Sequence, residues 1–489
     1  MRVRLDKRSR LLNEGTPPYA VSVARTISID EVRANWGSLE PGEETDEIVG
    51  VAGRVIFLRN TGKLCFATLQ GGFSSMSSGE RLQVMISLAE VGEDHLESWK
   101  SDVDLGDFIQ VTGQVIASKR GELSIMATTW AMASKALRPL PVLHKDLSEE
   151  TRVRQRYADL VVRSESRDMV RMRSAAMKSI RDTLDSEGFL EIETPVLQLL
   201  HGGATARPFN THLNAFNIDM TLRIALELYL KRAMVGGAER VYEIGRIFRN
   251  EGIDSSHSAE FSMLEFYAAW GDQWTVADTT RRLIQNAADA ALGSRQIEFY
   301  DTFIDLDGEW RWAKFFDLVS EAVGEQVTSD TSLEQLRKYA DEREISYDPK
   351  LDQGKMAMEL FSELVEETLI QPTFVCDYPA IAQPLARPHR DDPRMVEAWD
   401  LIIGGVERGT GFSELIDPVI QRERLVEQSL RAAGGDPEAM QLDEDFLKAL
   451  EFGAPPMGGV GVGIDRVMML FTGAGIRETI LFPLLRPTG

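Results

Sequence analysis

The stretch RVYEIGRIFRNEGIDSSHSAEFSMLEFY, residues 240–267, combines a strong strand pattern with charged side chains. Residues 240–251 and 260–270 are rich in β-branched, aromatic and other apolar residues, which is typical of strands. The serine- and histidine-containing segment between them is expected to be a loop. Arg249 and Glu265 lie inside the apolar runs, where charged side chains are rarely left without a partner. The stretch therefore predicts a strand–loop–strand unit with charged groups inside it.

Further charged residues lie in apolar or glycine-rich segments near the C-terminus. They are Asp400 in AWDLIIGG, Glu407 and Glu414 in VERGTGFSEL, and Arg466 in GVGIDR. A structural salt bridge would explain any single one of them. As a set, arginines, carboxylates and an aromatic side chain suit a Mg–nucleotide, because arginine binds phosphate and carboxylates bind Mg²⁺. The sequence has no P-loop, no GxGxxG after a strand, no GxSxG and no HExxH, so sites built on those motifs are excluded.

The surrounding segments predict an α+β domain. Apolar residues at helical spacing predict helices over 168–187, where Gly188 supplies a stop, and over 273–292. FLEIETP (189–195) and parts of 372–415 are expected to be strands. Asp417-Pro418 predicts the start of a helix over 418–433, and 458–473 predicts a glycine-rich strand that enters a helix. Strands and helices are intermixed without βαβ alternation, which favours a mostly antiparallel sheet with flanking helices.

The N-terminal part predicts a separate β domain. Five short runs rich in Val, Ile, Phe and Thr, punctuated by turn residues, lie at 49–60, 63–70, 81–87, 108–120 and 122–133. Five strands in so short a stretch suggest a small closed barrel, for which the OB-fold is the candidate. Residues 136–150 are expected to be a linker, so we predict domains at 1–148 and 149–489. The basic residues near the N-terminus fit a solvated helix end or a contribution to a nucleic-acid face.

Composition limits the class of protein. The 489 residues include 54 Lys plus Arg and 77 Asp plus Glu, a formal charge of −23, which argues against a protein that coats nucleic acid non-specifically. Cys65 and Cys376 are the two cysteines, which excludes a disulfide scaffold and a cysteine zinc site and fits a reducing, cytoplasmic location. No apolar run reaches the ~18–20 residues that span a bilayer, and the N-terminus lacks the apolar region of a secretory signal.

Three stretches in order resemble the motifs of class II aminoacyl-tRNA synthetases. GFLEIETPVL (188–197) resembles motif 1, residues 240–267 resemble motif 2, and GGVGVGIDRVMMLFTG (458–473) resembles motif 3. With the preceding OB-like domain, they are similar to the aspartate, asparagine and lysine subgroup. LRIALELYLKR, HGGATARPF, GFSEL and the ending ILFPLLRP are similar to the class II lysyl-tRNA synthetases.

The resemblance implies an activity. Such an enzyme activates L-lysine with ATP to lysyl-adenylate and pyrophosphate, and then transfers lysyl to the 3′ end of tRNA(Lys). Motif 1, around Pro195, would pack at a homodimer interface.

The resemblance also implies roles for the nucleotide and the metal. Arg249 would bridge the ATP α-phosphate and the amino-acid carboxylate, and Arg249 and Arg466 would be the catalytic residues. ATP would be bound by Arg249, Glu251, His257, Phe261 and Arg466, with Phe261 stacked on adenine. Asp400 and Glu407 would hold Mg²⁺, and Asp400 stands where glutamate is more common.

For the substrate lysine, the resemblance implies an acidic pocket. Gly203 and Glu227 would receive the α-ammonium group. The ε-ammonium group and the aliphatic stem would be enclosed by Glu265, Tyr267, Glu414 and Phe412. Thr410 stands where many members have an asparagine that touches the substrate carboxylate, and AIAQP (380–384) lacks the usual glutamate and serine. A substrate with two cations and one carboxylate needs such acidic groups plus one arginine.

In the barrel, Phe66, Gln83 and Glu122 match the family positions that read the central anticodon uridine. An aromatic ring can stack on a base splayed from the loop, while Gln and Glu can bond its edge. The alternatives are that Phe66 is a core residue and that Glu122 is simply solvated.

Three functions are compatible with these residues. The first is a lysine–tRNA ligase. The second is a synthetase-like paralogue that activates lysine or an analogue for a non-tRNA acceptor, although such relatives commonly lack the barrel. The third is a non-catalytic tRNA-binding protein, which the presence of Arg249, Glu407 and Arg466 disfavours.

Overall fold

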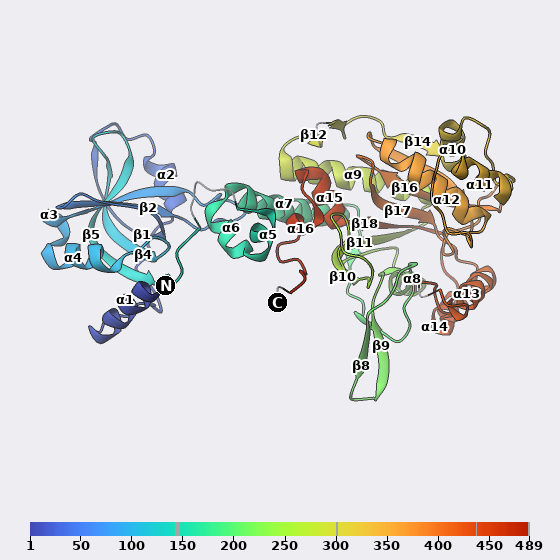
Figure 1. The fold of residues 1–489 in the computed structure, drawn as a ribbon, viewed down its shortest axis with the longest axis horizontal. Coiled ribbons are helices and arrows are strands. Elements are labelled where there is room, and N and C mark those ends of the chain that lie inside the picture. The colour runs from blue at the N-terminus through green and yellow to red at the C-terminus, as the bar shows by residue number, and fades with distance from the viewer. Residues whose placement is uncertain (142–146, 300–301, 437, 488–489) are drawn as a thin grey trace. The chain divides into compact units, whose positions relative to one another are not determined.

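The computed structural model describes residues 1–141, 147–299, 302–436 and 438–487 (Figure 1). These residues form two compact units, Met1–Arg171 and Met172–Gly489. The predicted linker 136–150 falls partly on residues 142–146, which lie outside the described residues.

The first unit contains the predicted five-stranded barrel. The strands pair in the order β1-β2-β3-β5-β4 and close on themselves, and they are β1 (Glu44–Asn60), β2 (Leu64–Gln70), β3 (Arg81–Ser87), β4 (Phe108–Ala117) and β5 (Leu123–Ser134). Alternate residues of β2, such as Cys65 and Ala67, fill the core, as the period of a strand requires. Besides the N-terminal helix described next, this unit contains α2 (Ile29–Trp36), α3 (Leu88–Val91), α4 (Glu93–Asp102), α5 (Glu149–Arg154) and α6 (Arg156–Val162).

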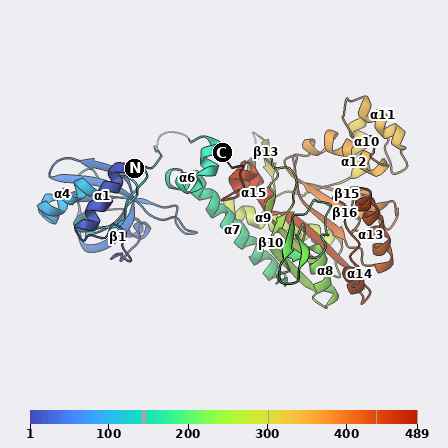
Figure 2. The same ribbon diagram turned by 60° about the horizontal axis from the view of Figure 1, so that its bottom comes forward.

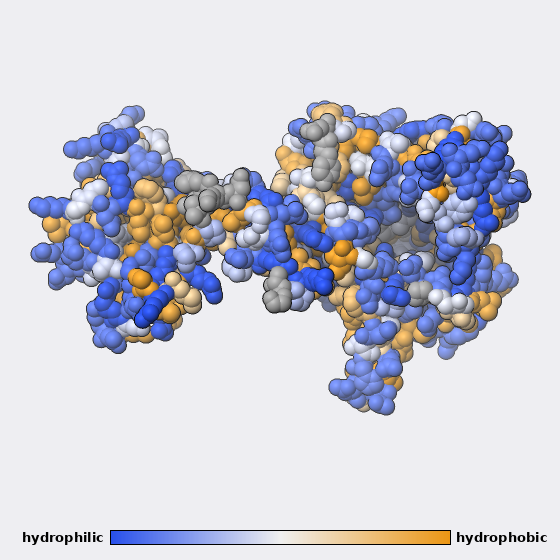
Figure 3. Space-filling view, viewed as in Figure 1, coloured by the Kyte–Doolittle hydropathy of each residue, from blue (hydrophilic) through white to orange (hydrophobic). Residues whose placement is uncertain are grey.

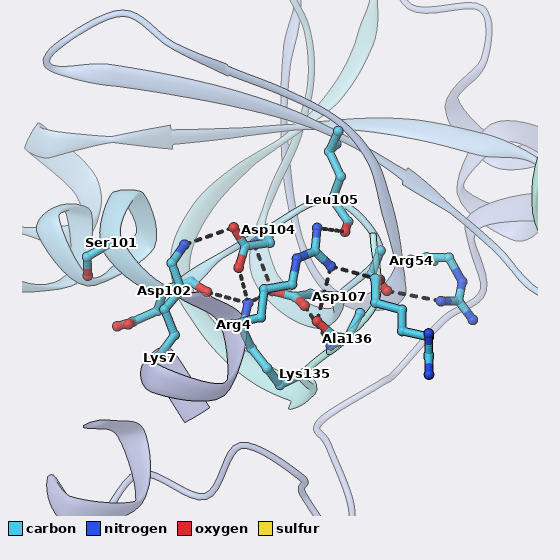
Figure 4. Close-up of polar contacts among 12 residues, drawn as sticks. Arg4, Lys7, Arg54, Ser101, Asp102, Asp104, Leu105, Asp107, Lys135 and Ala136 are labelled. Carbon is cyan, nitrogen blue, oxygen red and sulfur yellow. Dashed lines mark hydrogen bonds and ion pairs between the residues drawn. The ribbon is translucent and has the colours of Figure 1, made fainter. Parts of the chain in front are cut away.

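The basic N-terminal segment forms α1 (Arg2–Asn13), which is fastened to the barrel by polar contacts (Figure 4). Arg4 donates to the backbone carbonyl of Leu105 at 2.9 Å, and Lys7 binds Asp104 at 2.8 Å. Behind them the fully buried Lys135 binds Asp104 and Asp107, each at 2.6 Å. The solvated helix end expected from the sequence is therefore engaged at Arg4 and Lys7 by acidic and carbonyl groups of the same unit.

The second unit is built on an eight-stranded, mostly antiparallel sheet, as predicted. Its order is β14-β15-β16-β17-β18-β11-β10-β6, and only the pairs β14–β15 and β10–β6 are parallel among its ladders. The strands are β6 (Leu190–Glu191), β10 (Arg240–Phe248), β11 (Glu260–Ala269), β14 (Arg311–Lys314), β15 (Thr373–Pro379), β16 (Met395–Ile402), β17 (Glu407–Ser413) and β18 (Met457–Gly463).

Helices cover one face of this sheet and form the main core. Residues of α7 (Ser164–Ser186), α9 (Gln273–Leu292) and α15 (Ile464–Thr472) pack with Leu264 and Phe266 of β11. On the other face, α8 (Glu227–Val235) packs near Tyr267. Because α8 covers only part of that face, the rest of it is left for the cavities described below.

The remaining elements surround the sheet. Figures 1 and 2 show α10 (Phe315–Val323), α11 (Leu333–Asp341) and α12 (Gln353–Leu364) gathered in one group. The hairpin of β8 (Asn210–Leu213) and β9 (Ile218–Leu222) extends away from the sheet, and its tip is mainly hydrophilic in Figure 3. The other elements are β7 (Leu197–Gln198), β12 (Gln296–Phe299), β13 (Thr302–Asp305), a 3₁₀ turn (Glu366–Thr368), α13 (Pro418–Ala433), α14 (Glu444–Leu450) and α16 (Ile476–Thr479).

Most of the predicted elements are confirmed, and one is wrong over most of its length. The Asp417 side chain accepts hydrogen bonds from the first backbone N–H groups of α13, which is the predicted cap. In the predicted strand 189–195, only Leu190–Glu191 pair with β10. Farther along, the Thr194 hydroxyl donates to Glu243 at 2.6 Å, and Pro195 has no N–H to offer a ladder. None of the helices in the described ranges is long and apolar enough to cross a membrane.

Candidate active site

The floor of the site is a glycine-rich strand between two strands that carry side chains. In β18, Gly459, Gly461 and Gly463 point to the open face of the sheet, where the register pairs Gly459 with Tyr267 and Gly461 with Glu265. A Cβ atom at Gly459 would lie 2.0 Å from Glu414 Oε1 and 2.3 Å from the Tyr267 ring. Glycine is therefore required at this position for the neighbouring side chains to lie over the strand.

Strand β11 arranges its side chains in a row along this floor. Phe261, Met263, Glu265 and Tyr267 alternate with the core residues and so share the open face, roughly 7 Å apart. On the other side of β18, Thr410 and Phe412 face the same way from β17, paired with Gly461 and Gly459. Because side chains alternate along both strands, those on the open face form one continuous surface that runs from Phe261 at one end to Tyr267 at the other.

The end of this surface near Phe261 is a cavity lined by all five predicted ATP residues, Arg249, Glu251, His257, Phe261 and Arg466. The Arg249 guanidinium lies 5.3 Å from the centre of the Phe261 ring, and its Nε donates to the Ile224 carbonyl at 3.3 Å. Burial lowers the pKa of Arg249, opposed by the carboxylates of Glu251, Glu407 and Glu265. Two arginines and a histidine on one wall make this cavity suitable for phosphate groups.

Arg466 is held by two other predicted site residues, Glu407 and His257, and it follows a residue that sequence reasoning missed. Its Nη1 donates to the Glu407 carbonyl at 3.1 Å, and its Nη2 lies 3.4 Å from His257 Nε2. The preceding Asp465 is buried, binds Arg173 at 2.6 Å, and accepts the backbone N–H of Ser262 at 2.7 Å. The sequence signal for Asp465 was its position as an acidic residue within the apolar first turn of a predicted helix.

The other end of the surface is a second cavity lined by all seven residues predicted for lysine: Gly203, Glu227, Glu265, Tyr267, Thr410, Phe412 and Glu414. Arg249, Met263, Glu407, Thr410 and Gly461 line both cavities. The two cavities therefore adjoin, and Arg249 lies on their common wall.

The second cavity is strongly acidic. Glu265 accepts the Leu226 N–H at 2.8 Å and the Tyr267 hydroxyl at 3.1 Å. Burial and the nearby Glu227 raise the pKa of Glu265 to about 8. Burial, opposed by Lys231 and reinforced by Glu227, raises the pKa of Glu414 to about 8. Such shifts mean that the ionised carboxylates lack enough positive charge around them, which a cationic ligand would supply.

Lys231 is a second residue that sequence reasoning missed. It is fully buried, binds Glu227 at 2.6 Å, and also forms an ion pair with Glu414. The helical spacing of Glu227 and Lys231, four residues apart in α8, was the available signal.

The two residues predicted for Mg²⁺ occupy different positions. Glu407 lines both cavities, whereas Asp400 lies on neither wall and is next to Thr410 and Tyr378 in the sheet. Burial and Glu407 raise the pKa of Asp400 to about 7, so this pair of carboxylates would favour a cation. No cluster of three or more His, Cys, Asp or Glu side chains that could hold a metal occurs among the residues described. The donor pair fits Mg²⁺, which uses one or two carboxylates together with nucleotide phosphates.

In the barrel, the three predicted anticodon residues lie on its outer surface. Phe66 is half-buried and alternates with the core residues, so it is not itself a core residue. The Arg59 guanidinium lies 5.3 Å from the centre of its ring. Gln83 donates to Ser124 at 2.8 Å, and the Ser124 hydroxyl donates to the Glu122 carbonyl at 2.8 Å, which links these two positions. The Glu122 carboxylate itself is exposed, 3.5 Å from Arg33.

The chain resembles known proteins over its whole length. Residues 148–486 match the family model of class II tRNA synthetases (D, K and N), and residues 49–132 match that of the OB-fold nucleic acid binding domain. A lysine–tRNA ligase of Kineococcus radiotolerans is 55% identical over 489 residues, which is 100% of this chain and 97% of that protein. A lysine–tRNA ligase of Mycobacterium bovis is 54% identical over 493 residues, which is 99% of this chain and 97% of that protein. A lysylphosphatidylglycerol biosynthesis bifunctional protein of Mycobacterium marinum is 47% identical over 497 residues, covering 100% of this chain and 43% of that protein.

Proposed function

Since the chain belongs to the class II tRNA synthetases of the D, K and N group, we propose that it is a lysine–tRNA ligase. The observation that carries the proposal is the acidic cavity beside Arg249. Three buried carboxylates, those of Glu227, Glu265 and Glu414, line it, and Arg249 stands where it meets the nucleotide cavity. A substrate with two ammonium groups and one carboxylate matches this charge pattern.

In the first step, an oxygen of the lysine carboxylate attacks the α-phosphorus of ATP. The bond from that phosphorus to the oxygen bridging to the β-phosphate breaks, and pyrophosphate leaves with the electron pair. No general base is needed, because the carboxylate is already ionised. Arg249, on the wall common to both cavities, is placed to bind both reacting groups, so its contribution is positioning and charge neutralisation.

Arg466 and His257, which lie in contact in the first cavity, are placed to neutralise the charge of the outer phosphates of ATP. We propose that Phe261 stacks on adenine and that Glu251 contacts the adenine side. A Mg²⁺ ion bound with Asp400 and Glu407 would neutralise further phosphate charge.

Selectivity for lysine follows from the burial of the carboxyl groups that would bind its two ammonium groups. Gly203 and Glu227 are proposed to bind the α-ammonium group, and Glu265, Tyr267 and Glu414 the ε-ammonium group. A neutral isostere would leave two buried carboxylates without a cation, and rejection by unpaired polar groups reaches ~10⁴–10⁵. Phe412, which is 8% exposed on the cavity wall, would cover the aliphatic stem.

In the second step, the 3′-terminal hydroxyl of tRNA(Lys) attacks the carbonyl of lysyl-adenylate, and AMP leaves. We assign this chemistry to residues 149–489 and anticodon binding to residues 1–148. Phe66, Gln83 and Glu122 are the proposed contacts to the central uridine, and the half-buried Phe66, next to Arg59 on the outer surface of the barrel, is proposed to stack on the base. Because tRNA is the acceptor, we expect the enzyme to act in the cytoplasm.

We also propose a homodimer through motif 1. Apolar side chains are unusually exposed around Pro195, including Leu190 at 61%, Leu197 at 44% and Leu199 at 65%. Exposed apolar residues that gather in one segment are typical of an interface. A second copy of the chain would cover them.

A synthetase-like paralogue with a non-tRNA acceptor is less favoured. The chain carries a barrel that matches a nucleic acid binding model, and its similarity to ligases covers both chains almost entirely.

Aminoacylation tests the proposal directly. With ATP and Mg²⁺, the purified protein should attach labelled lysine to tRNA whose anticodon has a central uridine. Glu265→Gln should abolish most of this activity, whereas Glu260→Gln, an exposed residue on the same strand, should not. Absence of charging by the folded wild-type protein would exclude the proposed function.

A further inference from the structure

Lys231 lies behind the wall of the lysine cavity, where no solvent reaches it. Its Nζ binds Glu227 Oε1 at 2.6 Å and Glu414 Oε2, and it lies 3.5 Å from the carbonyl oxygen of Leu385. Glu227 is at the start of α8, whereas Glu414 directly follows β17. One buried ammonium group therefore connects two carboxylates that come from distant parts of the sequence.

Each of these carboxylates is shared between Lys231 and the cavity. Glu414 turns Oε2 to Lys231, while its Oε1 has no hydrogen-bond partner in the part of the chain that is described. That Oε1 lies over the floor, since a Cβ atom at Gly459 would meet it at 2.0 Å. Glu227 uses Oε1 for Lys231 and also lines the cavity. Thus Lys231 contacts the rear of both carboxylates and leaves acceptor capacity on the cavity side.

The charges facing Lys231 explain why a cation is needed there. Glu227, Glu265 and Glu414 are buried together, and Tyr267 adds a hydroxyl rather than a charge. Burial lowers the pKa of Lys231, but Glu227 and Glu414 outweigh it and raise that pKa above its usual value. Lys231 therefore stays charged, and the three buried carboxyl groups outnumber this one cation by two.

We propose that Lys231 is a positioning residue that fixes the separation of Glu227 and Glu414, and thereby selects a substrate whose two ammonium groups are one lysine length apart. The inference rests on the proposed function, in which Glu227 receives the α-ammonium group and Glu414 the ε-ammonium group. Lys231 touches neither substrate nor nucleotide in this arrangement. It acts through the two carboxylates, which would otherwise repel each other and separate.

Lys231→Met tests the proposal by removing the charge while keeping a similar length of side chain. In ATP–pyrophosphate exchange, the KM for lysine should rise about tenfold or more, equivalent to ~1.4 kcal/mol of lost binding, because displaced Glu227 and Glu414 bind the two ammonium groups less well. The KM for ATP should stay within twofold. The preference for lysine over ornithine, which is one methylene shorter, should fall as well. An unchanged lysine KM and an unchanged preference would overturn the proposal.

Lys135→Met is the matched control. Lys135 is also fully buried between two carboxylates, Asp104 and Asp107, but it lies in the barrel and borders no substrate cavity (Figure 4). This variant should lower the melting temperature and leave the lysine KM of exchange unchanged. An equal rise in lysine KM in both variants would show a general effect of removing a buried lysine and would overturn the proposal.

Lys231→Arg keeps the test decisive if the methionine variant does not fold. Arginine preserves the positive charge but places a larger, planar group between Glu227 and Glu414. If Lys231 only compensates charge, the arginine variant should recover the wild-type lysine KM and preference, and the proposal fails. If spacing matters, the folded arginine variant should still show a raised lysine KM and an altered preference for ornithine. Lysine-dependent exchange by the wild-type protein tests the proposed function separately.

Discussion

Thr410 lies at the junction of the two cavities, and its hydroxyl is only partly available to a substrate. It lines both cavities beside Arg249, yet its Oγ1 donates to the Trp399 carbonyl at 3.3 Å. An asparagine there would have a longer reach and an amide donor for the substrate carboxylate. With threonine, Arg249 would carry the proposed substrate carboxylate nearly alone.

We therefore expect Thr410→Asn to tighten lysine binding about 10- to 100-fold, the equivalent of ~1.5–3 kcal/mol for a hydrogen bond to a charged group, with little effect on ATP. The lysine KM of the variant measures this. Gln383 and Pro384 of the variant segment AIAQP line the same cavity, so an asparagine could instead meet a pocket reshaped around threonine. An unchanged or raised lysine KM would support that alternative.

Glu265 and Glu414 make lysine binding depend on pH. With pKa values of about 8, both carboxyls are largely protonated in the free protein at pH 6, and binding of ammonium groups must release those protons. Lysine affinity should therefore rise from pH 6 to about 8, where the ε-ammonium group, with a pKa of about 10.4, is still charged. Calorimetric titration in buffers of different ionisation enthalpy measures the protons released.

The same pKa shifts predict the stability of the protein without substrate. A carboxyl whose pKa is raised on folding stabilises the folded state at low pH, and this contribution is lost as pH rises from the ordinary value of 4.5 through about 8. The stabilisation that added lysine provides should grow over the same range. Constant affinity with no proton release would contradict the assignment of these carboxyls to the ammonium groups.

Among the elements, strand β18 depends most strictly on its sequence. A Cβ atom at Gly459 would overlap Glu414 and Tyr267, whereas at Gly461 the nearest atom would be Glu265 Cγ at an ordinary 3.7 Å. Gly459→Ala should displace those two side chains and raise the lysine KM at least tenfold with a smaller effect on ATP. Gly461→Ala, the matched variant on the same strand, should change the lysine KM much less. An equal rise in lysine KM for the two variants would contradict the explanation that a Cβ atom at Gly459 displaces Glu414 and Tyr267.

Strand β2 allows a separate test of the barrel. Phe66→Ala should weaken aminoacylation of tRNA with a uridine-centred anticodon by ~1–3 kcal/mol, the value of one base–aromatic stack, and leave pyrophosphate exchange intact. Phe108→Ala is the control, because Phe108 is also a barrel phenylalanine with an arginine, Arg54, 4.1 Å from its ring centre. Loss of both activities in the Phe66 variant would mean that it damages folding rather than tRNA binding.

Comparing the predicted helices and strands with those observed shows which of them local sequence patterns determine. Period-two alternation in β11 and the cap at Asp417 are local signals, so the strand and helix α13 were predictable. In the strand predicted at 189–195, only Leu190–Glu191 pair with β10, and Thr194 instead donates to Glu243, a long-range contact that no local pattern contains. Helix α2 was not predicted, although Ser28 and Glu31 form a capping box at its start, because this short helix lies next to much stronger strand patterns.

Strand register brings Glu265 and Tyr267 of β11 beside Thr410 and Phe412 of β17, whereas the other residues predicted to bind lysine or ATP, apart from Phe261 of β11, come from loops and helices. The seven residues predicted to bind the substrate lysine and the five predicted to bind ATP line adjoining cavities, as the family motifs implied. Lys231 and Asp465 were missed, since a lysine in a helix and an aspartate before an arginine are ordinary surface patterns until long-range contacts bury them. Asp400 lies beside Thr410 on the neighbouring strand and lines neither cavity, a position that the order of residues in one strand does not reveal.

For the chain as a whole, the charge of −23 and a proposed polyanionic partner are compatible because recognition is local. Hydrophilic residues cover much of the face in Figure 3, and near the predicted anticodon residues Arg33 and Arg59 supply positive charge. The acidic groups proposed to bind the ammonium groups of the substrate are buried in the second unit. Each unit thus carries the charge that suits its own proposed ligand.

The central claim is that the acidic cavity beside Arg249 binds lysine for reaction with ATP. Exchange of labelled pyrophosphate into ATP, measured separately with each of the twenty amino acids and no tRNA, tests it most directly. We predict that lysine supports exchange and that the other nineteen give only background. Exchange with another amino acid but not with lysine would contradict the account.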